Sequence, residues 1–458
     1  MPGGYLTVDE LTARATTLAA AHPGRAVLRS IGRSRAGEPI RVLSVGHGSR
    51  DVLVVAGPHA NEPIGGVTAL RLAHYLARAG RPGGPSARVP YGPWISDATW
   101  HFVLCLDPDG ARRNERWLKG PMTFAHHYRH FFRPGFARQP EWLPTEPGAA
   151  PMPETRALLR LQDELRPYLQ CSLHGVDVGG SFVQLTRELP GLADHLNRSA
   201  AEFRIPVERG PYDAFFWPSP GPGVYDMPRP QEADQFLSLP AATATSTWLR
   251  PHRYGTLTAV VEAPMWAVEE VGDTAPHPDP HGALEDISRR LREDARLLAG
   301  LLERVRPALT AATAPLLAPV EEYLAVCPGL ADEWAPEGPL GGTGGLEDRD
   351  LPLNRARIMA LRIAAQRLVV RTAGLLGQMF AVAYEAPSAP AADGPSAPEP
   401  EDVRITLDRF LTRRCAAFEV DCGARWIPVH DQVEHQFRTV LAVAELAARS
   451  NEPKAVRT

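Results

Sequence analysis

The 458-residue sequence has few cysteines, no long apolar segment and no leader-like N-terminus. Its five cysteines are an odd number, lie far apart and form no C-x-x-C pair, so we expect free, mostly buried thiols in a reducing compartment. No run approaches the roughly 18 apolar residues that a membrane helix needs. The first ten residues have neither a positive region nor an apolar core, which predicts a cytoplasmic protein without a signal peptide.

The sequence also lacks an excess of either charge. Its 49 basic and 53 acidic residues give a formal net charge of -4, and no basic stripe alternates with aromatic residues. Nucleic acid is therefore not expected as a partner. The length is sufficient for a large core and for two or three structural units.

What the sequence does contain is a short apolar run that stops at a polar turn. Residues 52–55 predict a buried strand, and residues 64–79 have the apolar spacing of a helix. His59 and Glu62 lie on the turn between them. An imidazole and a carboxylate three residues apart can bind one zinc ion, with a third ligand from elsewhere and a fourth position for water. Taken alone, the pair is equally typical of a surface histidine and a solvated glutamate.

Strands alternate with helices along residues 26–264, which predicts an α/β fold with a mixed, largely parallel central sheet flanked by helices. In such sheets, sites form at the carboxyl ends of strands. His174 ends a predicted strand that begins at residue 169, and Glu262 lies near the end of another that begins at residue 257. The sequence therefore predicts that these two residues join His59 and Glu62 in one site.

The predicted units follow changes in composition along the chain. A catalytic domain is expected first, then a helical extension, a Pro/Ala-rich linker and a C-terminal helical segment. Their boundaries are 1–305, 306–384, 385–401 and 402–458. We expect the helical regions to cap the site or to mediate self-association.

The four polar residues at strand ends suit metal-assisted hydrolysis of an amide. His59, Glu62 and His174 would hold one zinc ion per chain, and zinc lowers the pKa of bound water to about 7. Glu262 is the candidate general base that passes the proton to the leaving amine. An arginine between residues 112 and 116 would stabilise the oxyanion or bind a substrate carboxylate.

Six motifs occur in an order that resembles the zinc carboxypeptidase family typified by pancreatic carboxypeptidase A. They are Tyr5 with its following helix, Ile31-Gly-Arg-Ser-x-x-Gly37-x-Pro39-Ile40, Gly57-x-His59-x-x-Glu62-Pro63-x-Gly65, Asp107-Pro-Asp-Gly110, Ser172-Leu-His174-Gly175 and Thr258-x-x-x-Glu262-Ala-Pro. The resemblance covers about residues 5–300. The motifs are specific jointly rather than singly.

The resemblance implies zinc at His59, Glu62 and His174, with Glu262 as base. It also implies an arginine that polarises the scissile carbonyl, here Arg112 or Arg113. The Asn-Arg pair that binds the substrate's C-terminal carboxylate would be Asn114 with Arg113, its neighbour. For the family's mobile tyrosine the candidates are Tyr225 and Tyr254, and Tyr225 has the more suitable loop position.

The leading interpretation is a cytoplasmic zinc metallocarboxypeptidase that removes a C-terminal residue from a peptide. An alternative within hydrolases is a zinc amidohydrolase acting on N-acyl amino acids or γ-glutamyl cell-wall peptides. A third, from a different class, is a catalytically idle module that binds peptide C-termini. All three predict a peptide or small amide as the partner, and none requires a membrane.

Overall fold

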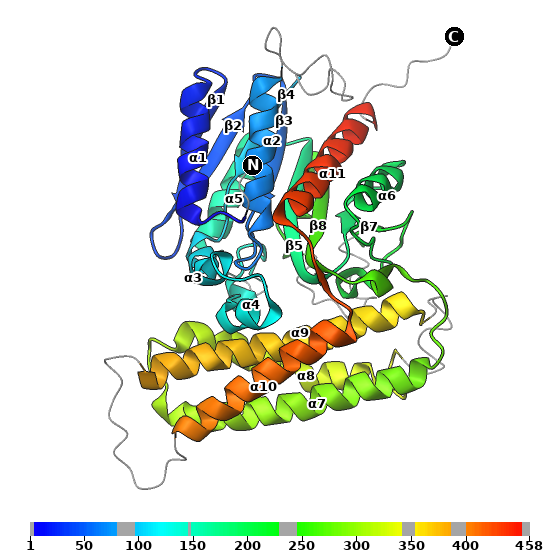
Figure 1. Ribbon diagram of the computed structural model, residues 1–458. Helices are drawn as coiled ribbons and strands as arrows, with labels where there is room; N and C mark the ends of the chain where they lie inside the picture. The colour runs from blue at the N-terminus through cyan, green and yellow to red at the C-terminus, as the bar shows by residue number, and fades with distance from the viewer. Residues whose placement is uncertain are drawn as a thin grey trace.

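The computed structural model describes residues 4–79, 97–144, 148–228, 245–340, 353–385 and 400–450 (Figure 1). Within these ranges, no helix combines the length and the apolar character needed to cross a membrane. Residues 386–399 of the expected 385–401 linker lie outside the described residues.

Nine strands of the described residues form one mixed sheet at the centre of the protein. Its strands are β1 (Ala26–Arg33), β2 (Pro39–Val45), β3 (Arg50–Ala56), β4 (Ala98–Val103), β5 (Leu169–Gly179), β6 (Phe182–Leu185), β7 (Val224–Asp226), β8 (Leu257–Ala267) and β9 (Arg425–Trp426). The order across the sheet is β1-β2-β4-β3-β5-β8-β6-β7, and β9 pairs with β8. The central strands β4, β3, β5 and β8 run parallel. The expected mixed sheet flanked by helices is therefore confirmed.

Helices cover both faces of the sheet and one of its ends. They are α1 (Val8–Ala21), α2 (Ile64–Arg78), α3 (Pro108–Leu118), α4 (Phe124–His130), α5 (Pro153–Leu165), α6 (Leu192–Glu202), α7 (Pro280–Val305), α8 (Ala314–Glu333), α9 (Arg355–Phe380), α10 (Pro400–Asp421) and α11 (Val429–Ser450). The first begins at a capping box, in which the Thr7 hydroxyl accepts from Glu10 N and the Glu10 carboxylate accepts from Thr7 N.

Alternation along β3 shows how the sheet buries both faces. Val52 and Val54 belong to the large core that includes α1 and α2, whereas Leu53 and Val55 pack with residues of α5 on the opposite face. Because successive side chains of a strand point to opposite faces, a continuous apolar run is the pattern of a strand covered on both sides.

Helices α7–α10 form a separate layer across the end of the sheet where α3 and α4 lie (Figure 1). Within this helical layer, α9 contacts α7, α8 and α10, and it also contacts α4 and β5. After α10 the chain returns to the sheet as α11, which packs against β8, α2 and α6. The last helix of the chain is thus part of the sheet's cover rather than of the helical layer.

The segment 111–151 contains helices where the sequence showed no clear period. The Asp107 side chain accepts from Gly110 N and caps α3. The buried face of α3 includes Asn114 beside Trp117 and Leu118. A polar residue on the buried face hides the apolar period that a helix otherwise shows.

Candidate functional site

The turn after β3 brings His59 and Glu62 into the interior. Gly57 begins it with a φ of 58°, and a Cβ at this position would lie 3.3 Å from the Cα of Cys105, so the left-handed glycine also permits close approach of the neighbouring chain. Glu62 N donates to His59 O at 3.2 Å, and α2 begins two residues later. Both side chains are buried.

His174 and Glu262 face this turn from the next two strands. β5 runs parallel to β3 and to β8, so the carboxyl ends of these three strands lie at one edge of the sheet. In the register of β5 and β8, His174 is directly opposite Glu262. The structure therefore brings together the four residues that the sequence placed at strand ends.

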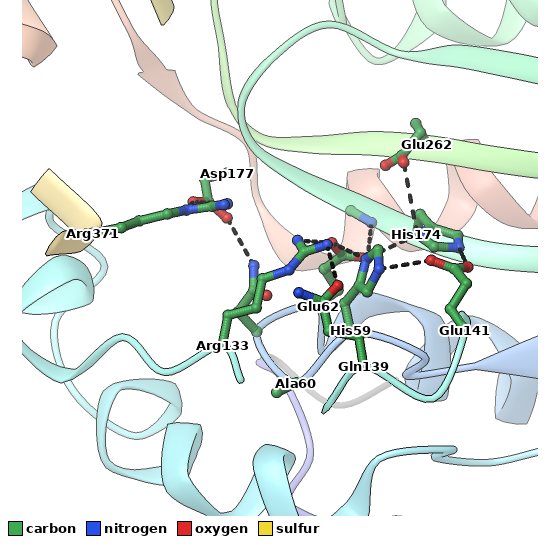
Figure 2. A network of polar contacts seen from close by, with 12 residues as sticks. His59, Ala60, Glu62, Arg133, Gln139, Glu141, His174, Asp177, Glu262 and Arg371 are labelled. Carbon is green, nitrogen blue, oxygen red and sulfur yellow. Dashed lines mark hydrogen bonds and ion pairs between the residues drawn. The ribbon is translucent and has the colours of Figure 1, made fainter. Parts of the chain in front are cut away.

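Two imidazoles and one carboxylate meet at short range. Ligand atoms of His59, Glu62 and His174 all lie within 4.8 Å of one another. His59 Nδ1 is 2.8 Å from Glu62 Oε1, and His174 Nδ1 is 3.1 Å from Glu62 Oε2 (Figure 2). This donor set, two imidazole nitrogens and one carboxylate, is one that zinc prefers in catalytic sites.

A third carboxylate, which the sequence did not single out, lies on the Nε2 side of the two histidine rings. Glu141 is fully buried, with one oxygen 2.7 Å from His59 Nε2 and the other 3.1 Å from His174 Nε2 (Figure 2). Each ring thus directs Nδ1 toward Glu62 and Nε2 toward Glu141. A carboxylate on the second nitrogen fixes the tautomer and orientation of a metal-binding histidine.

The position of Glu262 distinguishes the two sides of the rings. Its Oε1 lies 3.8 Å from His174 Nδ1, on the Glu62 side, and its buried Oε2 has no hydrogen-bond partner among the described residues. Arg133 is on the Glu62 side as well, with Nη1 3.3 Å from Glu62 Oε1 and Nη2 3.1 Å from Gln139 Oε1. A metal held by the Nδ1 atoms and Glu62 would therefore face both the carboxylate and the guanidinium.

Burial and charge act in opposite directions on the pKa values of four groups in the cluster, Glu62, Glu141, His174 and Glu262. Burial alone would raise the pKa of Glu62 and Glu141, but the histidines beside them hold the pKa of Glu62 well below its usual range and lower that of Glu141 to about 2. Burial would lower the pKa of His174, yet Glu141 and Glu62 raise it well above its usual value. Burial raises the pKa of Glu262 well above its usual range.

Helix α11 supports the same strand ends from the sheet face. Gln436 Nε2 donates to His174 O at 2.7 Å and to Val261 O at 3.0 Å. Ser181 Oγ donates to Glu262 O at 2.8 Å, and His435 Nε2 lies 2.7 Å from the same hydroxyl. These contacts fix the backbone of β5 and β8 at the residues that carry His174 and Glu262.

The structure does not bring Arg112 or Arg113 to the cluster. Arg112 forms ion pairs with Asp9 at 2.8 Å and with Glu38 at 3.0 Å. The Arg113 guanidinium lies 4.8 Å from the centre of the Phe132 ring. Arg133, which lies close to Glu62, follows α4 in a segment without a clear period, so the sequence did not distinguish it from the other arginines of that segment.

Asn114 and Tyr225 have their polar atoms engaged elsewhere. Asn114 Nδ2 donates to Ala60 O at 3.0 Å and to Phe132 O at 2.7 Å, and its Oδ1 accepts from Phe132 N at 3.0 Å. Asn114 thus ties the turn that carries His59 and Glu62 to the residue before Arg133. Tyr225 is buried, and its hydroxyl donates to Glu208 O at 2.9 Å.

Tyr254, the other candidate for the mobile tyrosine, donates its hydroxyl to Asp163 Oδ1 at 2.5 Å on an exposed surface. Residues 229–244, which precede it, lie outside the described residues.

Comparison with known proteins agrees with the resemblance. Residues 11–183 match the family model Peptidase_M14, described as zinc carboxypeptidase, which confirms the resemblance over this part of the chain. A search of curated proteins found no match.

Solved structures that resemble the chain include a metallo-carboxypeptidase from Burkholderia cenocepacia, with 20% identity, coverage of 57% of this chain and 60% of the other, and a TM-score of 0.37. Another is bovine thrombin-activatable fibrinolysis inhibitor in complex with tick carboxypeptidase inhibitor, with 12% identity, coverage of 56% and 86%, and a TM-score of 0.35. The chain thus spans about 60% of the first of these structures.

Proposed function

We propose that this protein is a zinc metallocarboxypeptidase that hydrolyses the C-terminal peptide bond of a peptide. The observation that carries the proposal is the convergence of Glu262 with His59, Glu62 and His174 at the ends of three parallel strands. The zinc carboxypeptidase match over residues 11–183 supports it. When bound, zinc would polarise the substrate carbonyl and lower the pKa of a water molecule.

Glu262 would act as the general base. Its carboxylate is buried and is aimed at the Nδ1 side of His174, with Oε2 free of hydrogen bonds from the described residues. A carboxylate in this position can take a proton from the attacking water and deliver it to the leaving amine. Burial around it excludes bulk water, which would otherwise weaken these electrostatic interactions.

Arg133 would take the role that the sequence suggested for Arg112. Its guanidinium is beside Glu62, where a carbonyl presented to the Nδ1 side would develop negative charge. An arginine aimed at this position stabilises the oxyanion more than the ground-state carbonyl. Gln139 and the Asn114–Phe132 hydrogen bonds hold the segment that carries it.

The same cluster also supports a zinc amidohydrolase acting on N-acyl amino acids or γ-glutamyl peptides. Arg133 supplies one guanidinium, whereas Arg112, Arg113 and Asn114 are engaged elsewhere. One guanidinium can serve the scissile carbonyl or a terminal carboxylate, but not both at once. The test must therefore show whether cleavage depends on a free carboxylate at the substrate's C-terminus.

The test is mass spectrometry of a peptide library incubated with the purified protein, with and without a zinc chelator. Each peptide is supplied with a free and with an amidated C-terminus. Loss of single C-terminal residues from free-acid peptides only, stopped by the chelator, is the expected result. Internal cleavage, or equal cleavage of amidated peptides, would contradict the carboxypeptidase proposal.

A Glu262→Gln variant serves as the catalytic control in the same experiment. We expect kcat to fall by about 10³-fold, because general-base catalysis contributes on the order of 10²–10⁴. Zinc content should stay at one per chain. If no peptide is cleaved but acylated amino acids are, the amidohydrolase is the better assignment; binding without turnover of either class would indicate an idle module.

A further inference from the structure

A buried ion pair connects the helical layer to the turn that carries His59 and Glu62. Asp177 lies on β5, three residues after His174, and is fully buried. Its Oδ2 accepts from Arg371 Nη2 at 2.6 Å and from Arg371 Nε at 3.0 Å. Arg371 comes from α9, outside the segment that matches the zinc carboxypeptidase model, and its side chain is only 9% exposed (Figure 2).

The other oxygen of Asp177 binds the turn itself. Asp177 Oδ1 accepts from Asn61 Nδ2 at 3.1 Å. Asn61 is fully buried and lies between His59 and Glu62 in the sequence. The chain of contacts Arg371–Asp177–Asn61 therefore ends on the backbone segment that presents two of the three candidate ligands.

Helix α9 also holds the segment that carries Arg133. The Arg371 guanidinium lies 4.7 Å from the centre of the Phe131 ring, and Gln378 Nε2 donates to Phe131 O at 2.7 Å. At Gly374 the helix passes so close that a Cβ would lie 1.9 Å from Tyr128 O. The same helix thus contacts both the strand of His174 and the segment of Arg133.

The charge balance makes this link sensitive to Arg371. Burial would raise the pKa of Asp177, but Arg371 lowers it below its usual range, so the carboxylate stays ionised. Without the guanidinium, the buried carboxylate loses its closest positive partner and is left with the Tyr128 hydroxyl at 3.5 Å and His127 Nε2 at 3.9 Å beside Oδ2, so it must take a proton or reorganise its partners. Either response changes the hydrogen bond that Asp177 Oδ1 accepts from Asn61 Nδ2.

We propose that Arg371 is a positioning residue for the metal centre: through Asp177 and Asn61 it fixes the turn that carries His59 and Glu62. The helical layer thereby sets the affinity for zinc and, if the proposed function holds, the rate of turnover. Arg371 contacts neither the candidate ligands nor Glu262 directly, and it acts through Asp177.

The test compares Arg371→Gln and Arg371→Lys with wild type in the full-length protein, with Arg355→Gln as the matched control. Arg355 begins the same helix, and its exposed side chain lies 3.7 Å from Asp273. Zinc affinity is measured by competition with a chromophoric chelator, and kcat and KM are measured with the best peptide. We expect zinc affinity to fall about 10- to 100-fold in Arg371→Gln, as for other residues that orient metal ligands.

In Arg371→Gln we expect kcat to fall with KM little changed, and in Arg371→Lys we expect partial recovery of zinc affinity and kcat. Arg355→Gln should keep wild-type zinc affinity. A purely structural role for Arg371 would not give this combination. Wild-type zinc affinity and kcat in a folded Arg371→Gln protein would overturn the proposal. Because zinc affinity is measured without substrate, this result stays independent of whether the protein cleaves peptides.

A second variant keeps the test decisive if Arg371→Gln does not fold. Asn61→Leu removes the hydrogen bond to Asp177 and leaves the Arg371–Asp177 ion pair in place. We expect the same loss of zinc affinity, with a circular dichroism spectrum like that of wild type. Unchanged zinc affinity in Asn61→Leu would overturn the proposal.

Discussion

The carboxyl end of the sheet and the helical layer α7–α10 use charge in different ways. At the sheet end, Glu62, Glu141 and Glu262 are buried and meet histidines from other parts of the chain. In the helical layer, ion pairs such as Arg304–Asp402 and Arg292–Asp332 lie on the surface. Burying charges is costly unless they are paired, so a concentration of them indicates a site rather than a stabilising feature.

Arg371 lies on α9 of the helical layer, but it is buried like the charged groups at the carboxyl end of the sheet. Its guanidinium is enclosed between Asp177 and Phe131. We therefore expect large functional effects at the sheet end, an intermediate effect where the two regions meet, and small effects elsewhere in the helical layer.

The largest effect in this comparison is expected at Arg133. Arg133→Gln should lower kcat/KM by about 10²- to 10³-fold, the usual loss when one oxyanion-stabilising donor is removed. Arg112→Gln is the matched control, because Arg112 is paired with Asp9 and Glu38 and should change kcat/KM less than about twofold. Steady-state kinetics on one peptide measures both. The reverse pattern would return the catalytic role to Arg112.

A smaller effect is expected for the carboxylate behind the histidine rings. Glu141→Gln keeps the shape of the side chain but removes the charge that faces both Nε2 atoms. Zinc affinity should fall about 10- to 100-fold, as is typical when the partner of a ligand histidine is lost. Competition with a chelator measures it. Glu164→Gln, which breaks an exposed ion pair with Arg29, is the control and should leave zinc affinity unchanged. Equal zinc affinity in the two variants would contradict an orienting role for Glu141.

The smallest effect is expected at an exposed ion pair of the helical layer. Arg304→Gln removes the 2.9 Å contact between α7 and α10 that Arg304 makes with Asp402. Its free energy of unfolding, from urea denaturation, should change by no more than about 0.5 kcal/mol, because exposed pairs are screened by solvent. Zinc affinity and kcat/KM should equal those of wild type. A loss of zinc affinity here would mean that the whole layer, not Arg371 alone, positions the turn.

The strand-end residues could be predicted because each followed a short apolar run. That pattern marks the carboxyl end of a buried strand, and parallel strands bring such ends to one edge. His59, Glu62, His174 and Glu262 meet there, as expected. Arg133 and Glu141 could not be found this way, because they do not follow an apolar strand. The path of their segment depends on its packing against α9 and against the imidazole rings of His59 and His174.

Asn114 shows the limit of reasoning from neighbouring residues. Its position beside Arg113 suggested a pair that binds a substrate carboxylate, yet the helix α3 directs it inward, where it joins Ala60 to Phe132. On a helix, successive residues point about 100° apart, so adjacent residues do not share a face.

The sequence by itself determined the mixed α/β fold, the three candidate ligands and the candidate base, because local apolar patterns define strands and the residues that end them. Only the tertiary structure decided which arginine lies beside the candidate ligands, which carboxylate contacts the histidines and how α9 reaches the turn that carries His59 and Glu62. Arg371 and Asp177 are 194 residues apart, and no local pattern encodes their contact. The fold buries both groups side by side, and in the interior each charge compensates the unfavourable burial of the other.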